Sequence, residues 1–289
     1  MDPLVNWALE LIRKTSTDLS PDVERWLRRA REEEAEGGTA WNVLDAMIRN
    51  VEMSREAGTP ICQDTGLTTF FVQVPRGTDP EAIREALQQA IRLATQEGSL
   101  RPNSVHPITG KNTGDNLGVD LPHIEFEPSP DDGLVIDLLL KGGGSENTGA
   151  QYRLPDAGLK AGRDLEGVYR CVVDAVHHAQ GHGCAPGILG VCIGGDRAGG
   201  YAGAKRQLLR PLDDTNPDPA LAELEERLIR DCNRLGVGPM GFGGRTTVLA
   251  VKVGWKHRHP ASFFVSIAYS CWADRHRRLE VRNGVGKVF

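Results

Sequence analysis

The sequence predicts an α+β protein, built as one compact domain over residues 1–289, with N-terminal helices and a mixed or antiparallel sheet. Helix-like amphipathic segments are interspersed with short apolar, β-branched runs, which favours this class. No internal repeat or low-complexity linker divides the chain. The 34 glycines exceed the average use of about 7% and gather in a few polar stretches, which favours loops collected at one end of the sheet.

The elements follow from the hydrophobic periodicity taken in chain order. The predicted helices are three amphipathic segments within 3–57, then 80–97, 163–181, 196–210 and 217–235. The predicted strands are 67–74, 133–140, 188–195, 246–255 and 261–271, and the last two could pair as neighbours. Residues 99–122, "SLRPNSVHPITGKNTGDNLGVDLP", form a long polar segment whose length and content favour a functional loop.

Composition excludes several classes of protein. The net charge of −5 offers no broad basic surface for nucleic acid. The longest apolar run, near "GLVIDLLL", is too short for a membrane span, and the N-terminus lacks the basic flank and apolar centre of a signal peptide. We therefore expect a cytoplasmic protein without membrane partners, whose six cysteines remain reduced thiols.

The six cysteines fall into two groups by position. Cys171, Cys192 and Cys232 lie inside apolar segments, where a cysteine usually packs as a small hydrophobic residue. The other three lie at the ends of predicted elements, where the backbone could aim their sulfurs into a shared cavity: Cys62, Cys184 and Cys271. No CxxC pair suggests a zinc ribbon or a ferredoxin-like cluster. A common metal site is one interpretation of the second group, and unrelated loop thiols are the other.

Six motifs occur in the same order in one protein family: "CQDTG", "KNTGDN", "KGGGSEN", "GCAPGILGVCIGGDR", "GPMGFGG" and "HPASFFVSIAYSCWADR". On these motifs the chain resembles the alpha subunit of the iron–sulfur hydro-lyases, the class I fumarate hydratases and the related L-tartrate dehydratases. The resemblance covers nearly the whole chain. It implies a [4Fe-4S] cluster held by Cys62, Cys184 and Cys271, with one iron left without a protein ligand.

The resemblance also implies what such a site does. An iron without a protein ligand can bind substrate oxygens and act as a Lewis acid. The implied reaction is the reversible addition of water across the double bond of a small unsaturated dicarboxylate. Asp64, two residues after Cys62, would handle the proton of the hydroxyl or water, and Gln63 would donate to a substrate carboxylate. The alternatives are a carboxylate that caps its own turn and an amide that packs the loop.

Three more residues are implied as substrate-binding groups. Arg101 would offer a planar bidentate donor to a carboxylate, and a surface arginine is the alternative. Gly144 would offer a backbone N–H, although which of Gly142, Gly143 and Gly144 does so stays open, as does a plain glycine-rich turn. His259, twelve residues before Cys271, would contact a carboxylate, whereas an isolated histidine is more often a satisfied surface or core residue.

Single-chain members of the family continue into a second domain, which the sequence does not show. We therefore expect a heteromer, α2β2, in which a separate beta subunit completes the active site. "KGGGSEN" and "IGGDRAGG" look more like the fumarase side of the family, with tartrate dehydratase as the alternative. A cluster-bearing redox sensor or a nucleotide-binding module without hydro-lyase activity is the alternative from a different class.

Overall fold

The computed structural model describes residues 2–289, which divide into two compact units. Unit 1 comprises residues up to Ser20, Arg49–Gly143 and Arg275–Phe289. Unit 2 comprises Pro21–Ile48 and Gly144–Asp274. Each unit combines helices with its own mixed sheet, which confirms the predicted α+β class. The single domain stays a prediction.

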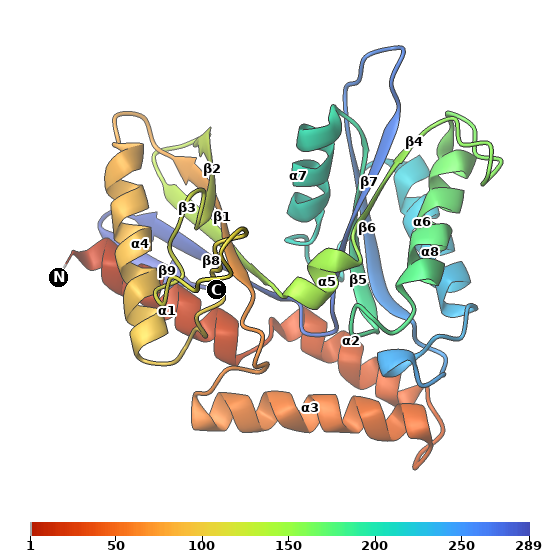
Figure 1. Cartoon of the computed structure of the whole chain (residues 1–289), viewed down its shortest axis with the longest axis horizontal. Coiled ribbons are helices and arrows are strands. Elements are labelled where there is room, and N and C mark those ends of the chain that lie inside the picture. The colour runs from red at the N-terminus through yellow and green to blue at the C-terminus, as the bar shows by residue number, and fades with distance from the viewer. Residues whose placement is uncertain (1) are drawn as a thin grey trace. The chain divides into compact units, whose positions relative to one another are not determined.

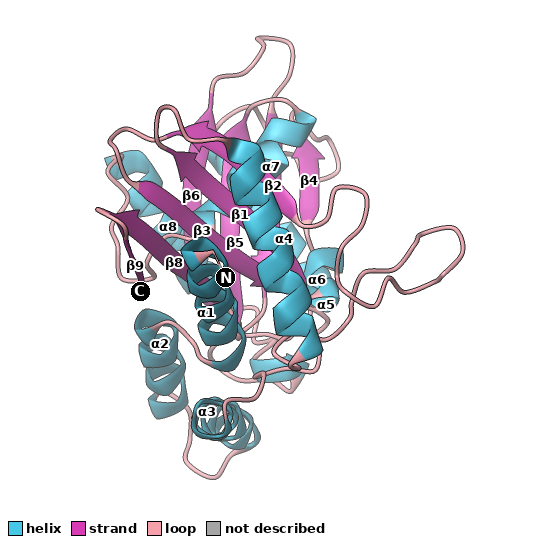
Figure 2. Ribbon diagram, turned by 90° about the vertical axis from the view of Figure 1, so that its left-hand side faces the viewer, coloured by secondary structure: helices cyan, strands magenta, loops and turns pink. Residues whose placement is uncertain are grey.

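Unit 1 is built on a five-stranded sheet of order β2-β1-β3-β8-β9. Helices α1 and α4 pack together and lie across one face of this sheet (Figure 2), where their apolar faces form the core. The bounds of the elements are α1 (Pro3–Thr17), β1 (Leu67–Val74), α4 (Pro80–Gln96), β2 (His123–Pro128), β3 (Leu134–Lys141), β8 (Arg275–Arg282) and β9 (Val285–Val288). β1 runs antiparallel to β3 with Leu67 opposite Lys141, so the loop before β1 and the turn after β3 meet at one edge of the sheet.

Unit 2 is a four-stranded sheet of order β4-β7-β5-β6 between two helical layers. Helix α7 covers one face, and α6 and α8 cover the other (Figure 1). The bounds are α2 (Pro21–Glu32), α3 (Thr39–Ala57, which continues into unit 1), α5 (Gly143–Asn147), β4 (Ala150–Arg153), α6 (Leu165–Ala179), β5 (Gly187–Gly194), α7 (Arg197–Gln207), α8 (Pro219–Asn233), the 3₁₀ turn η1 (Pro239–Gly241), β6 (Val248–Lys256) and β7 (Phe264–Ser270).

One predicted pairing is wrong. The sequence placed the strands at 246–255 and 261–271 as possible neighbours, but β5 lies between β6 and β7. β5 runs parallel to β6 and antiparallel to β7. Every residue of β5 is buried, so this strand is best placed in the middle of the sheet, where both of its faces and both of its edges are covered. The short connection between β6 and β7 favoured a hairpin of these two strands, whereas the burial of β5 accounts for the observed strand order.

Three helices begin in the same way. An aspartate precedes a proline at the start of α1, α4 and α8, and its carboxylate accepts a hydrogen bond from the backbone N–H two residues later, at 2.9, 3.0 and 2.9 Å. The proline occupies the first helical turn, where its missing N–H costs nothing. Each Asp-Pro pair therefore marks a helix start in both sequence and structure.

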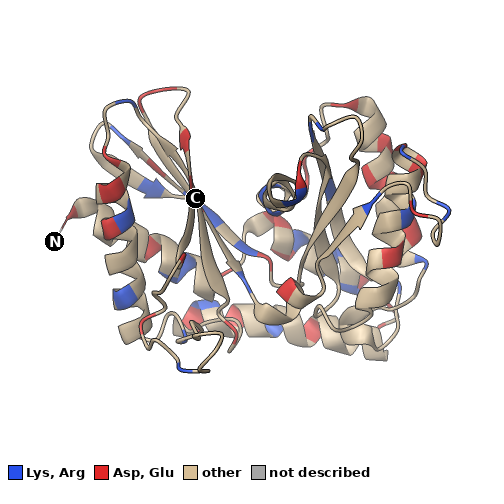
Figure 3. Ribbon diagram, turned by 45° about the horizontal axis from the view of Figure 1, so that its top comes forward, with Lys and Arg blue, Asp and Glu red and all other residues tan. Residues whose placement is uncertain are grey.

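No helix among residues 2–289 combines the length and apolar character needed to cross a bilayer. Figure 3 shows lysine and arginine interspersed with aspartate and glutamate along the elements of both units. Several of these charges are paired. In unit 2, for example, Arg210 and Lys252 both bond Asp214.

Candidate functional site

Unit 1 holds the "CQDTG" loop at the edge of its sheet, between α3 and β1. The carboxylate of Asp64 has a partner for each oxygen. Its Oδ1 accepts from the Gly66 N–H at 3.0 Å, and its Oδ2 accepts from the Gly143 N–H at 2.8 Å. The first bond is the turn cap that the sequence left as an alternative. The second ties the loop to the turn after β3, so Asp64 does more than cap its own loop.

Glycine is required where this loop enters β1. Gly66 has φ +81°, and a Cβ there would lie 2.7 Å from backbone atoms of Lys141. A side chain would therefore be strained by conformation and would also clash with the neighbouring strand. The close approach of Gly66 to β3 is what brings Asp64 within reach of Gly143.

The long segment 99–122 contains only isolated bridges and no regular strand or helix, as the sequence predicted for a loop. Its start is fastened to the "CQDTG" loop through Thr65. The Thr65 hydroxyl accepts from the Arg101 backbone N–H and from the Asn103 side-chain amide, both at 3.1 Å. Thr65 itself is buried. The exposed Arg101 therefore stands next to Gln63 and Cys62 because the loop behind it is held in place.

A pocket of about 340 Å³ in unit 1 brings three predicted residues together. Cys62, Gln63 and Arg101 line it, together with Thr65 and with residues at the end of α4. Asp64 is not among the lining residues; it lies on the Gly143 side of the loop. A thiol, an amide and a guanidinium around one pocket suit an anionic ligand that can also reach a metal.

In unit 2, the antiparallel pairing of β5 and β7 brings Cys184 and Cys271 into neighbouring loops. The first residues of β5 lie opposite the last residues of β7, with Ile188 facing Ser270. Cys184 precedes β5, and its carbonyl accepts from the Trp272 N–H at 3.1 Å. The backbone of Cys184 is in the left-handed region (φ 57°), which an ordinary side chain rarely adopts. Two of the three predicted cluster ligands therefore share one end of the unit 2 sheet.

Tyr269 fills the space behind these two cysteines. It is 2% exposed, and a Cβ at Gly183 or Gly187 would lie 2.4 or 2.3 Å from its ring. The glycines on both sides of Cys184 are thus needed to admit the ring. Burial raises the pKa of Tyr269, and the nearby Cys271 and Cys184 raise it further. Tyr269 therefore remains a neutral phenol in contact with the loops that carry the two thiols.

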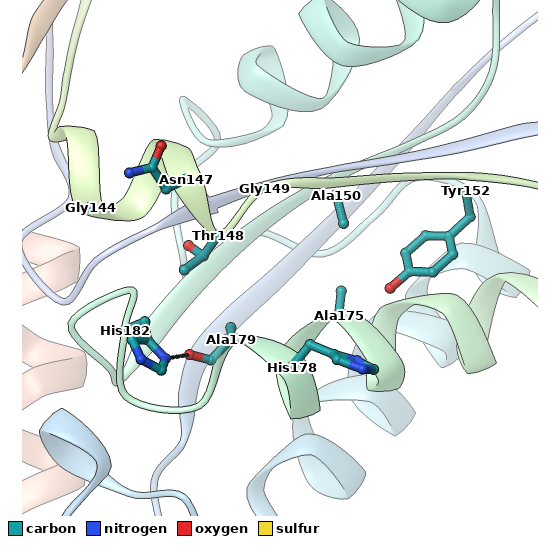
Figure 4. Close-up of a pocket in the computed structure, with 10 residues that line it drawn as sticks. All are labelled: Gly144, Asn147, Thr148, Gly149, Ala150, Tyr152, Ala175, His178, Ala179 and His182. Carbon is teal, nitrogen blue, oxygen red and sulfur yellow. Dashed lines mark hydrogen bonds between the residues drawn. The ribbon is translucent and has the colours of Figure 1, made fainter.

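Gly144 lies in unit 2 at the start of the short helix α5, and it is exposed. It lines a pocket of about 510 Å³ with Thr148, Tyr152, His178 and His182, among others (Figure 4). Of the three glycines left open by the sequence, Gly143 already donates its N–H to Asp64. Gly144 instead faces a pocket, so it remains the better candidate to offer a backbone N–H to a ligand.

A comparison with protein families gives a match over residues 5–280 to the model described as fumarate hydratase (Fumerase). The chain belongs to this family. A protein of Geobacillus stearothermophilus, provisionally named fumarate hydratase class I, is 48% identical over all of this chain. A Methanocaldococcus jannaschii protein, provisionally named L(+)-tartrate dehydratase subunit alpha, is 35% identical over 92% of it. The L(+)-tartrate dehydratase subunit alpha of Escherichia coli K12 is 31% identical, also over 92%.

The relatives differ in length. The matched region spans 57% of the Geobacillus protein, 93% of the Methanocaldococcus protein and 86% of the Escherichia coli protein. The chain thus covers little more than half of one fumarate hydratase relative and nearly all of two relatives named as alpha subunits. Those two names imply a separate partner subunit in the proteins that carry them. Fumarate hydratases and tartrate dehydratases are both hydro-lyases.

The six thiols of this fumarate hydratase family member divide into three that are buried and three that are partly exposed. A cluster ligand must be a thiolate. Burial raises the pKa of Cys171 and of Cys232 to about 12 each, and burial also raises the pKa of Cys192. These three are core thiols, as predicted. The predicted ligands, by contrast, are each partly exposed: Cys62, Cys184 and Cys271. The donor set present in the chain therefore fits three thiolate ligands.

Two predicted relationships link residues that lie apart in the sequence, the shared cluster site and the place of His259 near Cys271. Cys62 belongs to unit 1, and Cys184 and Cys271 belong to unit 2, so a cluster shared by all three stays a prediction. His259 is exposed in the connection between β6 and β7, and its Nδ1 accepts from the Ala261 N–H at 3.1 Å. The seven-residue strand β7 separates it from Cys271 by more than about 20 Å.

Sequence reasoning missed three residues that shape the site. Tyr269 and Arg275 belong to the "HPASFFVSIAYSCWADR" motif and Asn116 to the "KNTGDN" motif, but none of the three was singled out from the sequence. A local signal, and a weak one, existed only for the strand that begins at Arg275. Arg275 opens the segment "RHRRLEVR", whose alternating Leu279 and Val281 are typical of a strand.

Proposed function

We propose that this chain is the cluster-binding alpha subunit of a fumarate hydratase, which catalyses the reversible hydration of fumarate to malate. In this proposal Cys62, Cys184 and Cys271 hold a [4Fe-4S] cluster, and a separate beta subunit completes the active site in an α2β2 assembly. The observation that supports it most is the thiol set: within a fumarate hydratase family chain, the three partly exposed cysteines are the three that the family motifs mark as ligands.

The pocket in unit 1 supports two of the proposed substrate-binding groups, Gln63 and Arg101. When bound, the cluster supplies a Lewis-acidic iron that polarises a substrate hydroxyl. Arg101 offers a planar, bidentate donor to a carboxylate, and Gln63 offers an amide donor beside it. Gly144 contributes a backbone N–H. His259 is left out of this set, because β7 holds it more than about 20 Å from Cys271. These groups orient a dicarboxylate, whose two charges match two separate sets of donors.

Asp64 is the proton-transfer group of the proposal. Hydrogen bonds from Gly66 and Gly143 hold its two carboxylate oxygens at 3.0 and 2.8 Å, so the side chain has one fixed orientation. A group that takes a proton from a hydroxyl, or returns it to water, needs this positioning more than an unusual affinity for protons. The opposing proton-transfer residue belongs to the beta subunit in this proposal.

L-tartrate dehydratase is the second candidate, because two relatives carry that name at 35% and 31% identity. The 48% identity to the relative named fumarate hydratase favours fumarate. A non-catalytic iron–sulfur sensor is the third candidate.

All six cysteines are free thiols, which suits a cytoplasmic protein.

The test is to produce the chain anaerobically with a beta-type partner chain of the family and to measure iron, sulfide and turnover. We expect about four irons per alpha chain, and fumarate hydration that needs the partner. Faster dehydration of tartrate than hydration of fumarate would transfer the proposal to tartrate dehydratase. A stable cluster without turnover of either substrate in the complex would favour the sensor.

A further inference from the structure

Arg275, the first residue of β8, is a buried arginine of which two guanidinium nitrogens lack a hydrogen-bond partner within residues 2–289. It is 1% exposed and is the largest fully buried side chain among residues 2–289. Its Nε and Nη1 have no hydrogen-bond partner within those residues. A buried guanidinium is costly unless its N–H groups are bonded and its charge is paired. For folding alone, an apolar side chain of similar volume would serve better at this position.

The surroundings of Arg275 add to this cost. Arg275 lies opposite Leu140 of β3, and the next residue of β3 is Lys141, which is 5% exposed. Two buried cationic side chains therefore lie on adjacent strands at the same edge of the unit 1 sheet. This edge is also where the loop before β1 and the turn after β3 meet.

Asp64 is an anionic group that reaches this edge. A Cβ on Gly142 would lie 2.9 Å from Asp64 Oδ2 and 3.8 Å from Arg275 Nη2. The carboxylate oxygen and the guanidinium nitrogen are thus both close to the position that a side chain on Gly142 would occupy. Because glycine has no side chain, nothing of Gly142 stands between them. The same Oδ2 accepts the Gly143 N–H.

We propose that Arg275 is a positioning residue that acts through Asp64. This inference rests on the proposed function, in which Asp64 transfers a proton. The fixed positive charge of Arg275 attracts the carboxylate towards Gly142 and Gly143 and disfavours rotamers that swing it away. Burial holds the guanidinium rigid, so its charge keeps one place relative to Asp64. In this proposal the buried charge of Arg275 destabilises the fold but orients the carboxylate of Asp64.

The test uses the alpha–beta complex with Arg275→Met and Arg275→Lys. We expect Arg275→Met to keep its iron content, to show an equal or higher Tm, and to lose about 10–100-fold in kcat with KM little changed, as for a displaced catalytic group. Arg275→Lys restores the charge and should recover most of the lost kcat. These shifts run in opposite directions for stability and turnover, which a purely structural arginine would not produce.

Arg277 on the same strand provides the matched control. It donates to Asp18 at 2.9 Å and to the Leu19 carbonyl at 2.8 Å. Its charge is therefore compensated, and Arg277→Met should lower Tm and leave kcat unchanged. If Arg275→Met behaves in this way instead, Arg275 is structural and the proposal is overturned. Full turnover of Arg275→Met would overturn it as well.

A double-mutant cycle in Tm separates this inference from the proposed function, because it needs no activity. Asp64→Asn removes the carboxylate that faces the guanidinium, so it should lower Tm more in the wild-type background than in the Arg275→Met background. Equal effects in both backgrounds would overturn the link between the two residues. Absence of hydro-lyase turnover in the wild-type complex would instead overturn the proposed function, whatever the cycle shows.

Discussion

The side chain of Asn116 holds the backbone of Arg101 from behind. Its Nδ2 donates to the Arg101 carbonyl and to the Thr95 hydroxyl, both at 2.9 Å, and its Oδ1 accepts from the Asn103 N–H at 2.6 Å. Asn116 is buried and has φ 61°, a conformation that asparagine adopts more readily than most residues. One amide thus joins the end of α4 to the loop that presents Arg101.

Replacing Asn116 by aspartate should weaken substrate binding. The change turns a donor into an acceptor, so an oxygen would face the Arg101 carbonyl and the loop would shift. A buried group left without its partner costs about 1–3 kcal/mol. We expect KM to rise about 10-fold, since 1.4 kcal/mol is a factor of ten, while kcat changes little. Steady-state kinetics of the complex measures this. The exposed Asn42 gives the control, and an unchanged KM for Asn116→Asp would contradict the prediction.

Alanine substitutions should separate ligand cysteines from core cysteines. Cys184→Ala should abolish the visible absorption of the cluster, and so should the same change at Cys62 or Cys271. Cys192→Ala removes a buried thiol that packs against Gly203 and should leave the absorption largely intact, with a modest fall in Tm. Anaerobic spectra with iron analysis test this. Loss of the cluster in a folded Cys192→Ala together with its retention in Cys184→Ala would reverse the assignment.

Much of the fold was predictable because local signals agree with burial. The strand at 67–74 and the starts of the helices at 80–97 and 217–235 were found within two residues, since apolar periodicity acts locally. The strands β2, β4, β8 and β9 were missed. Their side chains are mostly half-exposed, so they lack a strong apolar pattern, and only pairing with a neighbouring strand identifies them.

The site was predictable only where motif and geometry coincide. Cys62, Gln63 and Arg101 line one pocket, as the motifs suggested. The role proposed for Arg275 could not be predicted, because it depends on the register that places β8 against β3 beside Gly142. Likewise, the sequence predicts a strand between His259 and Cys271. The distance between the two residues, however, is known only from the extended course of β7 in the structure.

Ionisation of Asp214 should make the thermal stability of unit 2 fall at low pH. Burial alone would raise its pKa, but hydrogen bonds from Arg210 and Lys252 outweigh burial and lower the pKa below its ordinary value of 3.8. A lowered folded-state pKa stabilises above the unfolded pKa, and this contribution is lost as pH falls through the folded pKa. Wild type should therefore exceed Asp214→Asn in Tm by a constant amount between about pH 5 and 7, and the gap should close below about pH 4.

Calorimetric Tm values for both proteins across this range measure the gap. Asp213 provides the control, because its contact with Arg25 is largely exposed and an exposed pair contributes little. Asp213→Asn should differ from wild type by a small amount that varies little with pH. A gap for Asp214→Asn that persists undiminished to pH 3 would show that the carboxylate does not stabilise the fold through its charge.

The last prediction concerns Asp64, whose two roles can be separated. Asparagine has one acceptor oxygen, so Asp64→Asn can keep only one of the bonds from Gly66 and Gly143. If Asp64 only caps its turn, the variant loses some Tm and a folded complex keeps its turnover. If Asp64 transfers a proton, the folded complex should keep its cluster and its affinity for substrate and lose about 100-fold or more in kcat. Gln63→Ala and Arg101→Ala should instead raise KM, since in the proposed function these two side chains bind the substrate without moving a proton. Iron analysis, substrate binding and steady-state kinetics on the same preparations decide between the two roles, and near-normal kcat in a cluster-replete Asp64→Asn complex would leave only the turn cap.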